Sequence, residues 1–336
     1  MKGVIPYNGF VKVIERQNPE IIESSDAIIR VTRSAICTSD FHIINNAVPR
    51  YVPDTILGHE FVGEVVETGS SVSKLKVGDR VAANCITFCG ECYFCRHGFI
   101  NNCIKGGWEL GCRIDGGQAE YVRVPYADMG LNKIPDDVSF DSALFVGDIL
   151  SSGYFAADGI KNGDTVAVIG AGPVGLCSMM CARYLGAKKV IAIDIDNARL
   201  EFAKQFADYT INPQSENIEQ TIHEITKYGA DYVIEAAGGN DTFETAWKIA
   251  RANAVVFVVA MYETPQILPL NIMYGKNLTF KTGGVDAVYC DKLLQLISEG
   301  KISTDFLISK TFPFERVEDA YREFSKKEIY KVVLEY

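Results

Sequence analysis

The sequence predicts a two-domain α/β protein, in which a mostly β unit comes first and a doubly wound parallel sheet follows. The chain has 336 residues, which is enough for about two domains. Up to about residue 125, short stretches rich in Val, Ile and Gly are separated by turn residues, as in a β unit. From about residue 151, near-continuous apolar strands alternate with helical patterns, which indicates a parallel sheet covered by helices.

The first unit is expected to span residues 1–150. Its strand patterns, in chain order, are FVKVIE, AIIRVTRSAI, FVGEVVETG, GDRVAAN and AEYVRVP. Each pattern is short, rich in β-branched residues and bounded by turn residues, which is typical of strands. A helical pattern at 140–160 then predicts a connector to the second unit.

The second unit is expected to span residues 151–284. TVAVIGAGPVGLCSMMCARYLGA predicts a strand, a Gly-rich turn and a helix, and KVIAIDIDNARLEFAKQFA repeats the strand and the helix. The stretches ADYVIEAAGG, NDTFETAWKIA and NAVVFVVAM continue the alternation. Residues 285–336 hold two more helical patterns and two strand patterns, which by pattern alone fit either unit.

The composition argues against several classes of partner. The net charge is −10 and no block of Lys or Arg interrupts it, which argues against nucleic acid and against an anionic membrane surface. The apolar run at 254–261 is far too short to cross a bilayer, and the N-terminus meets charge and Pro before a signal segment can form. We therefore expect a cytoplasmic protein whose ten cysteines serve metal or core roles rather than disulfides.

A dinucleotide site is predicted where GAGPVG (170–175) follows a strand and opens a helix. The three glycines of this motif serve the tight turn, the approach of a pyrophosphate and the packing of helix on strand. The expected contacts in the turn are Gly170, Gly172, Pro173, Val174 and Gly175. Asp194 ends the next strand, where an acid binds ribose hydroxyls, and no Arg follows at 195–197, so we expect NAD rather than NADP. The alternative is a structural β-turn-α unit without a ligand.

Four cysteines stand in one short stretch, CGECYFCRHGFINNC (89–103). Cys89, Cys92, Cys95 and Cys103 have the spacing x2, x2 and x7. A ferredoxin-type [4Fe–4S] run would close with x3 and then Pro, whereas four thiolates suit a closed tetrahedral zinc. A closed site leaves no position for a substrate, so we expect a structural zinc in a lobe at 85–112 and chemistry elsewhere. His97 lies within the stretch and is expected to be solvated.

A second constellation of metal-binding residue types is dispersed. AICTSDFH (35–42) contains Cys37, and LGHEFVGE (57–64) contains His59 and Glu60. A catalytic zinc needs about three protein ligands and an open position, and thiolate and imidazole suit zinc. Spacing alone does not bring these residues together, since Cys37 also fits a core position on a strand and His59 also fits a turn.

Together these stretches closely resemble the zinc-dependent alcohol dehydrogenases of the medium-chain dehydrogenase/reductase family, with a pattern nearest to bacterial secondary-alcohol dehydrogenases. The matching stretches include CTSDFH (37–42), GHEFVGEVVETGSSVSKLKVGDRV (58–81), the four-cysteine lobe, DGGQAEYVRVP (115–125), VGDILSSGYFAA (146–157) and VIGAGPVG with Asp194. The resemblance implies a GroES-like catalytic domain and a Rossmann domain, with residues 285–336 returning to the catalytic domain.

The resemblance also implies the residues of the catalytic zinc site. The matched ligands are Cys37, His59 and Asp148. Many relatives have Cys where this chain has Asp148. Glu60 matches a carboxylate that binds zinc or lies just behind it, and Asp40 matches an acid that orients the ligand histidine. Ser39 and His42 match a proton relay.

Further residues match contacts to the cofactor and the substrate. Ser152 matches a position beside the nicotinamide, Arg199 a ribose contact, and Lys331 a pyrophosphate contact; a solvated surface cation is the alternative for the last two. Cys85 and Trp108 match positions in the substrate pocket. The secondary-alcohol enzymes often lack the cysteine lobe and prefer NADP, so their substrate class does not transfer directly.

The expected function is zinc-dependent, reversible oxidation of an alcohol, secondary or of medium size and apolar, to a ketone or aldehyde. Hydride passes to NAD, and each chain holds two zinc ions, one catalytic and one structural. The partners are small molecules, without nucleic acid or membrane, and the expected assembly is a homotetramer, with a dimer as the alternative. A polyol or sugar-alcohol dehydrogenase and, from another class, a non-enzymatic NAD or redox sensor are the competing interpretations. A zinc-free reductase of the same fold would lack both metal-binding groups.

Overall fold

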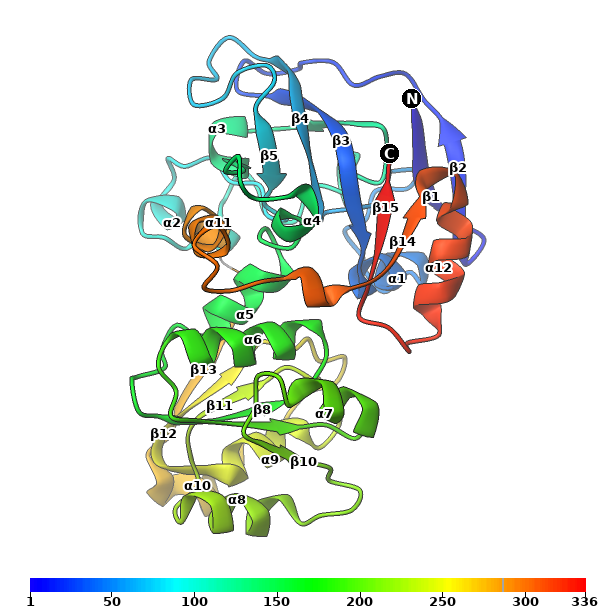
Figure 1. Ribbon diagram of the computed structural model, residues 1–336. Coiled ribbons are helices and arrows are strands. Elements are labelled where there is room, and N and C mark those ends of the chain that lie inside the picture. The colour runs from blue at the N-terminus through cyan, green and yellow to red at the C-terminus, as the bar shows by residue number, and fades with distance from the viewer. Residues whose placement is uncertain (286) are drawn as a thin grey trace. The chain divides into compact units, whose positions relative to one another are not determined.

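The computed structural model describes residues 1–285 and 287–336. The chain divides into two compact units (Figure 1). The first unit combines Met1–Ser151 with the C-terminal segment that ends at Tyr336, and the second unit is Ser152–Val285.

A seven-stranded sheet forms the centre of the first unit. Its order is β14-β15-β3-β4-β5-β7, and β6 also pairs with β3. The strands are β3 (Ala27–Ile36), β4 (Phe61–Thr68), β5 (Arg80–Ala83), β6 (Tyr121–Val124), β7 (Leu131–Lys133), β14 (Ile308–Pro313) and β15 (Lys331–Glu335). Strand β15 runs antiparallel to β3, with Val332 opposite Ile36, so the last strand of the chain completes a sheet that the first part begins.

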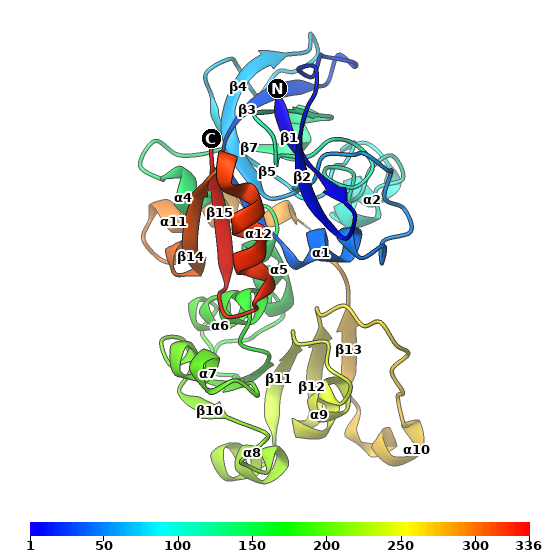
Figure 2. The ribbon, with the colours of Figure 1, turned by 90° about the vertical axis from the view of Figure 1, so that its right-hand side faces the viewer.

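Short helices and a two-stranded ribbon surround this sheet. The ribbon is β1 (Lys2–Tyr7) with β2 (Phe10–Glu15), seen in Figure 2. The helices are α1 (Thr38–Ile44), α2 (Tyr93–Arg96), α3 (Ala127–Gly130), α4 (Phe140–Ala143), α11 (Cys290–Ser298) and α12 (Val317–Ser325). Helix α12 packs against β2, β14 and β15, and its buried Val317, Ala320 and Tyr321 join the core there. Apolar burial of this kind is the main force that holds such layers together.

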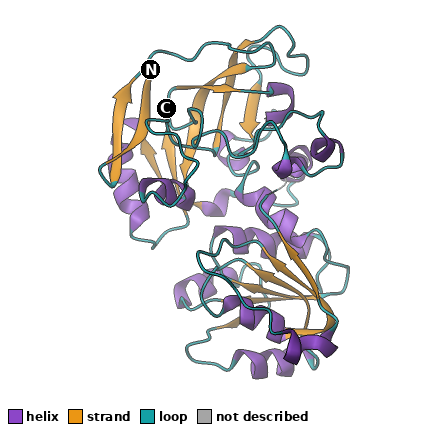
Figure 3. Cartoon of the chain, turned by 180° about the vertical axis from the view of Figure 1, so that it is seen from behind, coloured by secondary structure: helices purple, strands orange, loops and turns teal. Residues whose placement is uncertain are grey.

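Six parallel strands form the sheet of the second unit, in the order β10-β9-β8-β11-β12-β13. The strands are β8 (Thr165–Ile169), β9 (Lys189–Ile193), β10 (Tyr209–Ile211), β11 (Ala230–Glu235), β12 (Ala250–Val258) and β13 (Thr279–Thr282). The helices are α6 (Pro173–Tyr184), α7 (Asn197–Ala203), α8 (Ile218–Thr226), α9 (Thr242–Ile249) and α10 (Leu270–Met273). Helices cover both faces of the sheet (Figure 3). The chain order reverses between β8 and β11, and ligands bind at such a switch point, outside the carboxyl ends of the strands.

The connector predicted at 140–160 is two helices rather than one. Helix α4 ends at Ala143, α5 spans Ile149–Ala157, and a turn at 144–148 separates them. In this turn the Gly147 carbonyl accepts a hydrogen bond from the Cys85 amide at 3.2 Å. The turn therefore lies against the chain just after β5, and it carries Asp148. In the described part of the chain, no helix has the length and apolar character that a bilayer crossing requires.

Candidate metal centres and dinucleotide site

Four dispersed side chains meet in the first unit. One ligand atom each from Cys37, His59, Glu60 and Asp148 lies within 4.8 Å of the others. Cys37 follows β3 and begins α1, whereas His59 and Glu60 directly precede β4. The neighbouring strands join these positions, because the Ala35 amide donates to the Glu60 carbonyl at 3.0 Å. Sheet pairing, which the spacing of the residues could not show, therefore assembles the group.

The imidazole of His59 is oriented with one nitrogen toward this group. Its Nε2 lies 3.3 Å from Asp148 Oδ2, and its Nδ1 lies 4.0 Å from Asp40 Oδ1. Burial would lower the pKa of His59, but hydrogen bonds and charge from Asp148 and Cys37 raise it well above its ordinary value. A proton on His59 thus balances the surrounding anions, and a bound cation would replace it. Thiolate, imidazole and carboxylate together form a donor set that suits zinc.

Asp40 is held firmly behind His59. Its Oδ2 accepts hydrogen bonds from the Cys37 amide at 2.9 Å and from Gln118 Nε2 at 3.0 Å. Gln118 in turn accepts from the hydroxyl of Tyr321 at 2.7 Å. Burial raises the pKa of Asp40. The sequence pattern indicated no role for Gln118 or Tyr321. Gln118 stands in the stretch DGGQAEYVRVP (115–125), but nothing in that stretch linked it to Asp40.

A buried ion pair stands beside the candidate ligands. Lys331 Nζ bonds to Glu60 Oε1, and the two side chains are only 2% and 0% exposed. Burial would lower the pKa of Lys331, but the charges of Cys37, Glu60 and Asp148 raise it. The Glu60 atom Oε2 is buried and has no hydrogen-bond partner. The resemblance suggested Lys331 as a pyrophosphate contact, with a solvated strand-end cation as the alternative. In the structure its ammonium is buried and bonds to Glu60.

The predicted relay residues lie on α1, beside Cys37. Ser39 Oγ is 3.5 Å from Cys37 Sγ. His42 follows three residues later, and positions i and i+3 lie on the same side of a helix. His42 is half-buried. The arrangement places a hydroxyl next to the candidate metal ligands and an imidazole one turn further along.

The two predicted pocket residues lie at the same group. Cys85 is buried, and burial followed by the charge of Asp148 raises the pKa of its thiol well above the ordinary value. The ring of Trp108 meets the ring of His59 edge to face, with centroids 5.5 Å apart. The indole Nε1 of Trp108 is buried without a hydrogen-bond partner. The guanidinium of Arg50 lies over the Trp108 ring, with its Cζ 5.2 Å from the ring centroid.

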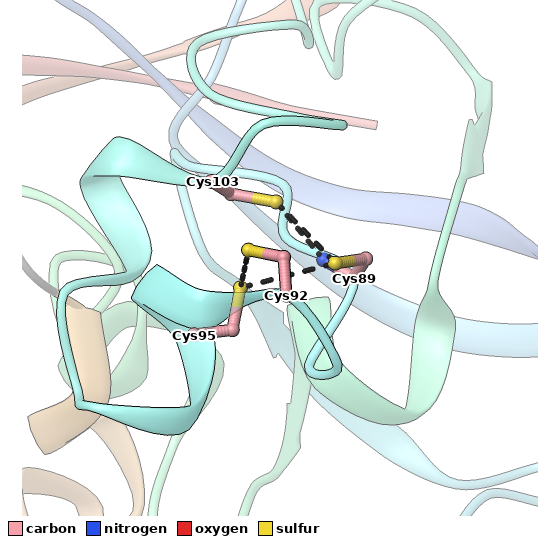
Figure 4. A group of neighbouring side chains, drawn as sticks. All are labelled: Cys89, Cys92, Cys95 and Cys103. Atoms are coloured by element: carbon pink, nitrogen blue, oxygen red, sulfur yellow. Dashed lines mark hydrogen bonds between the residues drawn. The ribbon is translucent and has the colours of Figure 1, made fainter.

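The four clustered cysteines point their sulfur atoms toward one another (Figure 4). The Sγ–Sγ distances are 3.5 Å for Cys92–Cys95, 3.6 Å for Cys103–Cys89 and 4.0 Å for Cys89–Cys95. A tetrahedron with Zn–S bonds of about 2.3 Å has edges of about 3.8 Å, so the four sulfurs fit a zinc ion. His97 Nδ1 instead lies 2.7 Å from the Tyr93 carbonyl on the exposed side of the lobe.

The glycine-rich turn joins β8 to α6 in the second unit. Gly170 has φ +98°, and a Cβ on Gly175 would lie 1.8 Å from the Gly170 carbonyl oxygen, so both positions require glycine. Gly172 is the N-cap of α6, Pro173 is its first residue, and Val174 follows. The start of a 12-residue helix is thus open to an anion.

Asp194 and Arg199 lie around the same turn. Asp194 Oδ2 accepts from the Ala171 amide at 2.7 Å, and Oδ1 accepts from the Asp196 amide at 2.9 Å. Arg199 reaches back from α7, with a guanidinium nitrogen 4.0 Å from where a Cβ on Gly172 would stand. Ser152 is a buried residue of α5 in the second unit.

Comparison with known proteins identifies both units. Residues 23–136 match the alcohol dehydrogenase GroES-like domain, and residues 173–298 match the zinc-binding dehydrogenase domain. An uncharacterised zinc-type alcohol dehydrogenase-like protein of Bacillus subtilis is 34% identical, over 99% of this chain and 100% of its own length.

Solved structures agree with this match. The alcohol dehydrogenase TADH from Thermus sp. ATN1 superposes with a TM-score of 0.95 at 36% identity, covering 100% of this chain and 99% of its own. Galactitol-1-phosphate dehydrogenase from Escherichia coli superposes with a TM-score of 0.90 at 31% identity, and the match covers both chains completely. The fold predicted from the sequence, a GroES-like domain with a Rossmann domain, is confirmed.

Proposed function

The chain belongs to the zinc-dependent alcohol dehydrogenases of the medium-chain family, and from this premise we propose which alcohol it oxidises and with which residues. The proposed reaction is the reversible oxidation of a secondary or medium-size apolar alcohol to a ketone or aldehyde, with hydride transfer to NAD. One observation carries the proposal. It is the convergence of Cys37, His59, Glu60 and Asp148 within 4.8 Å in a buried group whose donors suit zinc.

Three residues would hold the catalytic zinc, and others would position them. Cys37, His59 and Asp148 are the proposed ligands. When bound, the zinc supplies Lewis acidity that polarises an alcohol or carbonyl oxygen. Asp40, fixed by Cys37 and Gln118 and 4.0 Å from Nδ1 of His59, would keep Nε2 of His59 turned toward the metal position. Lys331 holds Glu60 and so favours a shell of three ligands with an open fourth position.

Proton transfer is assigned to α1. Ser39 would accept the proton of the alcohol hydroxyl, because its own hydroxyl lies beside Cys37. His42, one turn along the helix, would carry that proton toward solvent, since an imidazole can accept a proton on one nitrogen and release one from the other. In the reverse direction the same two side chains return a proton to the carbonyl oxygen.

Cofactor binding is assigned to the second unit. The turn Gly170–Gly175 and the start of α6 would bind the pyrophosphate. Arg199, whose guanidinium reaches toward Gly172, would contact the adenosine ribose. Asp194 would accept hydrogen bonds from the ribose hydroxyls, and its charge would repel a 2′-phosphate, which supports NAD over NADP. Ser152 is proposed to lie beside the nicotinamide.

The cysteine lobe would hold a second zinc with a structural role. All four sulfur positions of the shell are filled by Cys89, Cys92, Cys95 and Cys103, so no position is left for a substrate. Helix α2 of this lobe has only four residues and buries none of them. The lobe would therefore gain its stability from the metal.

We further propose a cytoplasmic homotetramer. Its support is a segment of the second unit, 261–274, with large apolar side chains exposed at Met261, Ile267, Leu268, Leu270, Ile272 and Tyr274. Such clustering marks an interaction surface more often than single exposed residues do. Strand β13 follows this segment in the chain and is the last strand of the sheet. Its outer edge is not paired with another strand in the described structure. Cysteine groups that suit zinc rather than disulfides fit a cytoplasmic location, where thiols stay reduced.

A polyol dehydrogenase is the second candidate, because galactitol-1-phosphate dehydrogenase resembles this chain over its whole length. Trp108, whose ring packs on His59, favours the apolar substrate. An activity screen with NAD over primary, secondary, cyclic and polyol alcohols separates the two. We expect the highest kcat/KM with a secondary or medium-size apolar alcohol, and a higher value with a polyol would favour the second candidate.

The ligand assignment has its own test. Cys37→Ser should abolish turnover and lower the zinc content from about two to about one per chain, because a hydroxyl is a far weaker zinc ligand than a thiolate. Full zinc content together with turnover in this variant would contradict the assignment. Cys177→Ser, in the second unit, is the matched control, because Cys177 is also buried but is not part of either metal-binding group.

A further inference from the structure

Glu235 is a buried acid to which the proposed function gives no role. It ends β11, in the centre of the parallel sheet of the second unit, and its side chain is 0% exposed. The three residues before it, Tyr232, Val233 and Ile234, are buried in the apolar core. A carboxyl group is costly to bury unless it is hydrogen-bonded, so its partners indicate what it serves.

Glu235 fixes the beginnings of two loops at once. Its Oε1 accepts hydrogen bonds from the amides of Ala237 and Gly238, both at 2.9 Å. Its main-chain carbonyl accepts from the amides of Val259 and Ala260 at 2.9 and 3.2 Å. The side chain thereby holds the loop after β11, residues 236–241. The main-chain carbonyl, which any residue supplies, holds the start of the loop after β12, residues 259–262.

A second link joins the same two loops. The hydroxyl of Thr242 donates to the Gly239 carbonyl at 2.9 Å, which leaves its oxygen to accept from the Tyr262 hydroxyl at 2.8 Å. Burial and then the carboxylate of Glu235 are among the causes that raise the pKa of Tyr262. Glu235, Thr242 and Tyr262 therefore form one polar cluster under the two loops.

These loops border the two features at the carboxyl ends of the strands where a ligand would bind, a cavity and the glycine-rich turn. A cavity of about 430 Å³ is lined by residues 258–262 and 282–284, together with Phe243 and Gln266, at the carboxyl ends of β12 and β13. On the other side, a Cβ on Gly170 would lie 3.0 Å from the Ala236 carbonyl carbon, so the glycine-rich turn packs on the loop after β11. The carboxyl ends of the strands are where sheets of this topology bind dinucleotides.

We propose that the Glu235 side chain is a positioning group for the dinucleotide, which acts by holding the loop after β11 against the glycine-rich turn and beside the cavity. The inference rests on the proposed NAD-dependent function. Glu235 does not touch the cofactor in this account. Its two accepted amide bonds set the loop geometry, and its loss leaves both amides to find other partners.

Two variants test the proposal through binding of NADH, measured by fluorescence titration without substrate. Glu235→Ala removes both side-chain bonds and should raise the Kd for NADH about tenfold or more. Glu235→Gln keeps an oxygen that accepts both amides, so its Kd should stay within about threefold of the parent chain. At saturating NAD, kcat of Glu235→Ala should change less than KM for NAD, and its zinc content should stay at two per chain.

A matched control lies at the other end of the same strand. Asp231 Oδ2 accepts from the Thr165 amide at 2.7 Å, and Oδ1 pairs with Arg251. Asp231→Ala should lower the unfolding temperature while leaving the Kd for NADH unchanged. If Glu235→Ala does not fold, Glu235→Asp tests the same two bonds, because its shorter side chain withdraws the carboxylate from the amides of Ala237 and Gly238 and should raise the Kd by a smaller factor.

The outcomes separate this inference from the function on which it rests. A parent chain that binds no NADH would refute the proposed function. A parent chain that binds NADH, with Glu235→Ala (or Glu235→Asp in its place) binding equally well, would overturn only the role of Glu235. An equal loss in Glu235→Gln and Glu235→Ala, or an equal loss in Asp231→Ala, would also overturn it, because the accepted amide bonds would not then be the cause.

Discussion

At the scale of single residues, the candidate zinc site is an arrangement of compensating charges. Three acidic side chains, Cys37, Glu60 and Asp148, are gathered around one imidazole, and Lys331 is the cation beside them. A buried carboxylate without a partner costs several kcal/mol, so Glu60 depends on Lys331. The pair stabilises the folded chain. It also holds the Glu60 carboxylate toward Lys331.

This argument predicts the effect of Lys331→Met. The variant leaves Glu60 buried and unpaired, and we expect the free energy of unfolding of the first unit to fall by about 3–5 kcal/mol. Glu60→Gln in the same chain removes the orphaned charge and should restore a large part of this loss. Denaturant unfolding of the parent, both single variants and the double variant completes the cycle. Equal stability of Lys331→Met and the double variant would contradict the pairing.

A second prediction at this scale concerns the metal-free cysteine lobe. Hydrogen bonds from the backbone at Cys95 and Ile104 lower the pKa of Cys92 to about 6, whereas burial raises the pKa of Cys95 to about 12. Above pH 6, Cys92 is therefore a thiolate, and the thiolate is the form that alkylates. Iodoacetamide at pH 7 should modify Cys92 before Cys95, as mapped by mass spectrometry.

The control for this order is the zinc-loaded chain, in which all four thiols should be protected. Exposure argues for the opposite order, because Cys92 is buried and Cys95 is partly exposed. Modification of Cys95 first would show that access, and not thiolate formation, governs the lobe. At pH 5, below the pKa of Cys92, its advantage should largely disappear.

At the scale of elements, the two proposed zinc sites differ in how much hydrophobic burial already joins their segments. The lobe that holds Cys89 to Cys103 consists of a four-residue helix, a three-residue 3-10 turn and loops. The catalytic group, in contrast, stands where β3, β4 and the turn before α5 already meet within a packed sheet. Loss of the lobe zinc should therefore affect folding more than chemistry, and loss of the catalytic zinc the reverse.

Cys95→Ser tests this difference between the two sites. We expect the variant to lose about one zinc per chain and to unfold at a temperature several degrees lower, because structural zinc contributes directly to folding. Its kcat at a temperature where it is folded should stay within about threefold of the parent chain. A variant that keeps its unfolding temperature but cannot turn over would place the lobe in the chemistry.

Much of the element order could be predicted because local patterns carry it. The strand, glycine turn and helix at 165–184 follow from apolar periodicity and turn chemistry, and so do the last helix and strand of the chain. The break at 144–148 could not be predicted in this way, because it is set by the hydrogen bond between Cys85 and Gly147, which are far apart in sequence. The roles of Gln118 and Lys331 depend on such long-range contacts as well.

At the scale of the whole molecule, the structure decides to which unit the C-terminal segment belongs, which the sequence pattern alone left open. By periodicity, residues 285–336 fitted either unit, but β15 pairs with β3 and α12 packs in the core of the first unit. Because the end of the chain returns, the second unit is continuous and inserted, and Lys331 enters the sheet next to Glu60. The return thus contributes a side chain to the candidate site as well as a strand.

The segment 261–274 leads to the last prediction, on assembly. Ile272 is 68% exposed and Tyr274 is 87% exposed in the described chain, and exposure of large apolar side chains in one short segment is costly in water. Light scattering coupled to gel filtration should show a homotetramer for the parent chain, and Ile272→Lys with Tyr274→Lys should shift it to smaller species. Tyr228→Lys, at a similarly exposed tyrosine outside the segment, should leave the mass unchanged. A parent chain that elutes as a monomer, or a double variant with the mass of the parent, would show that this segment is not the contact.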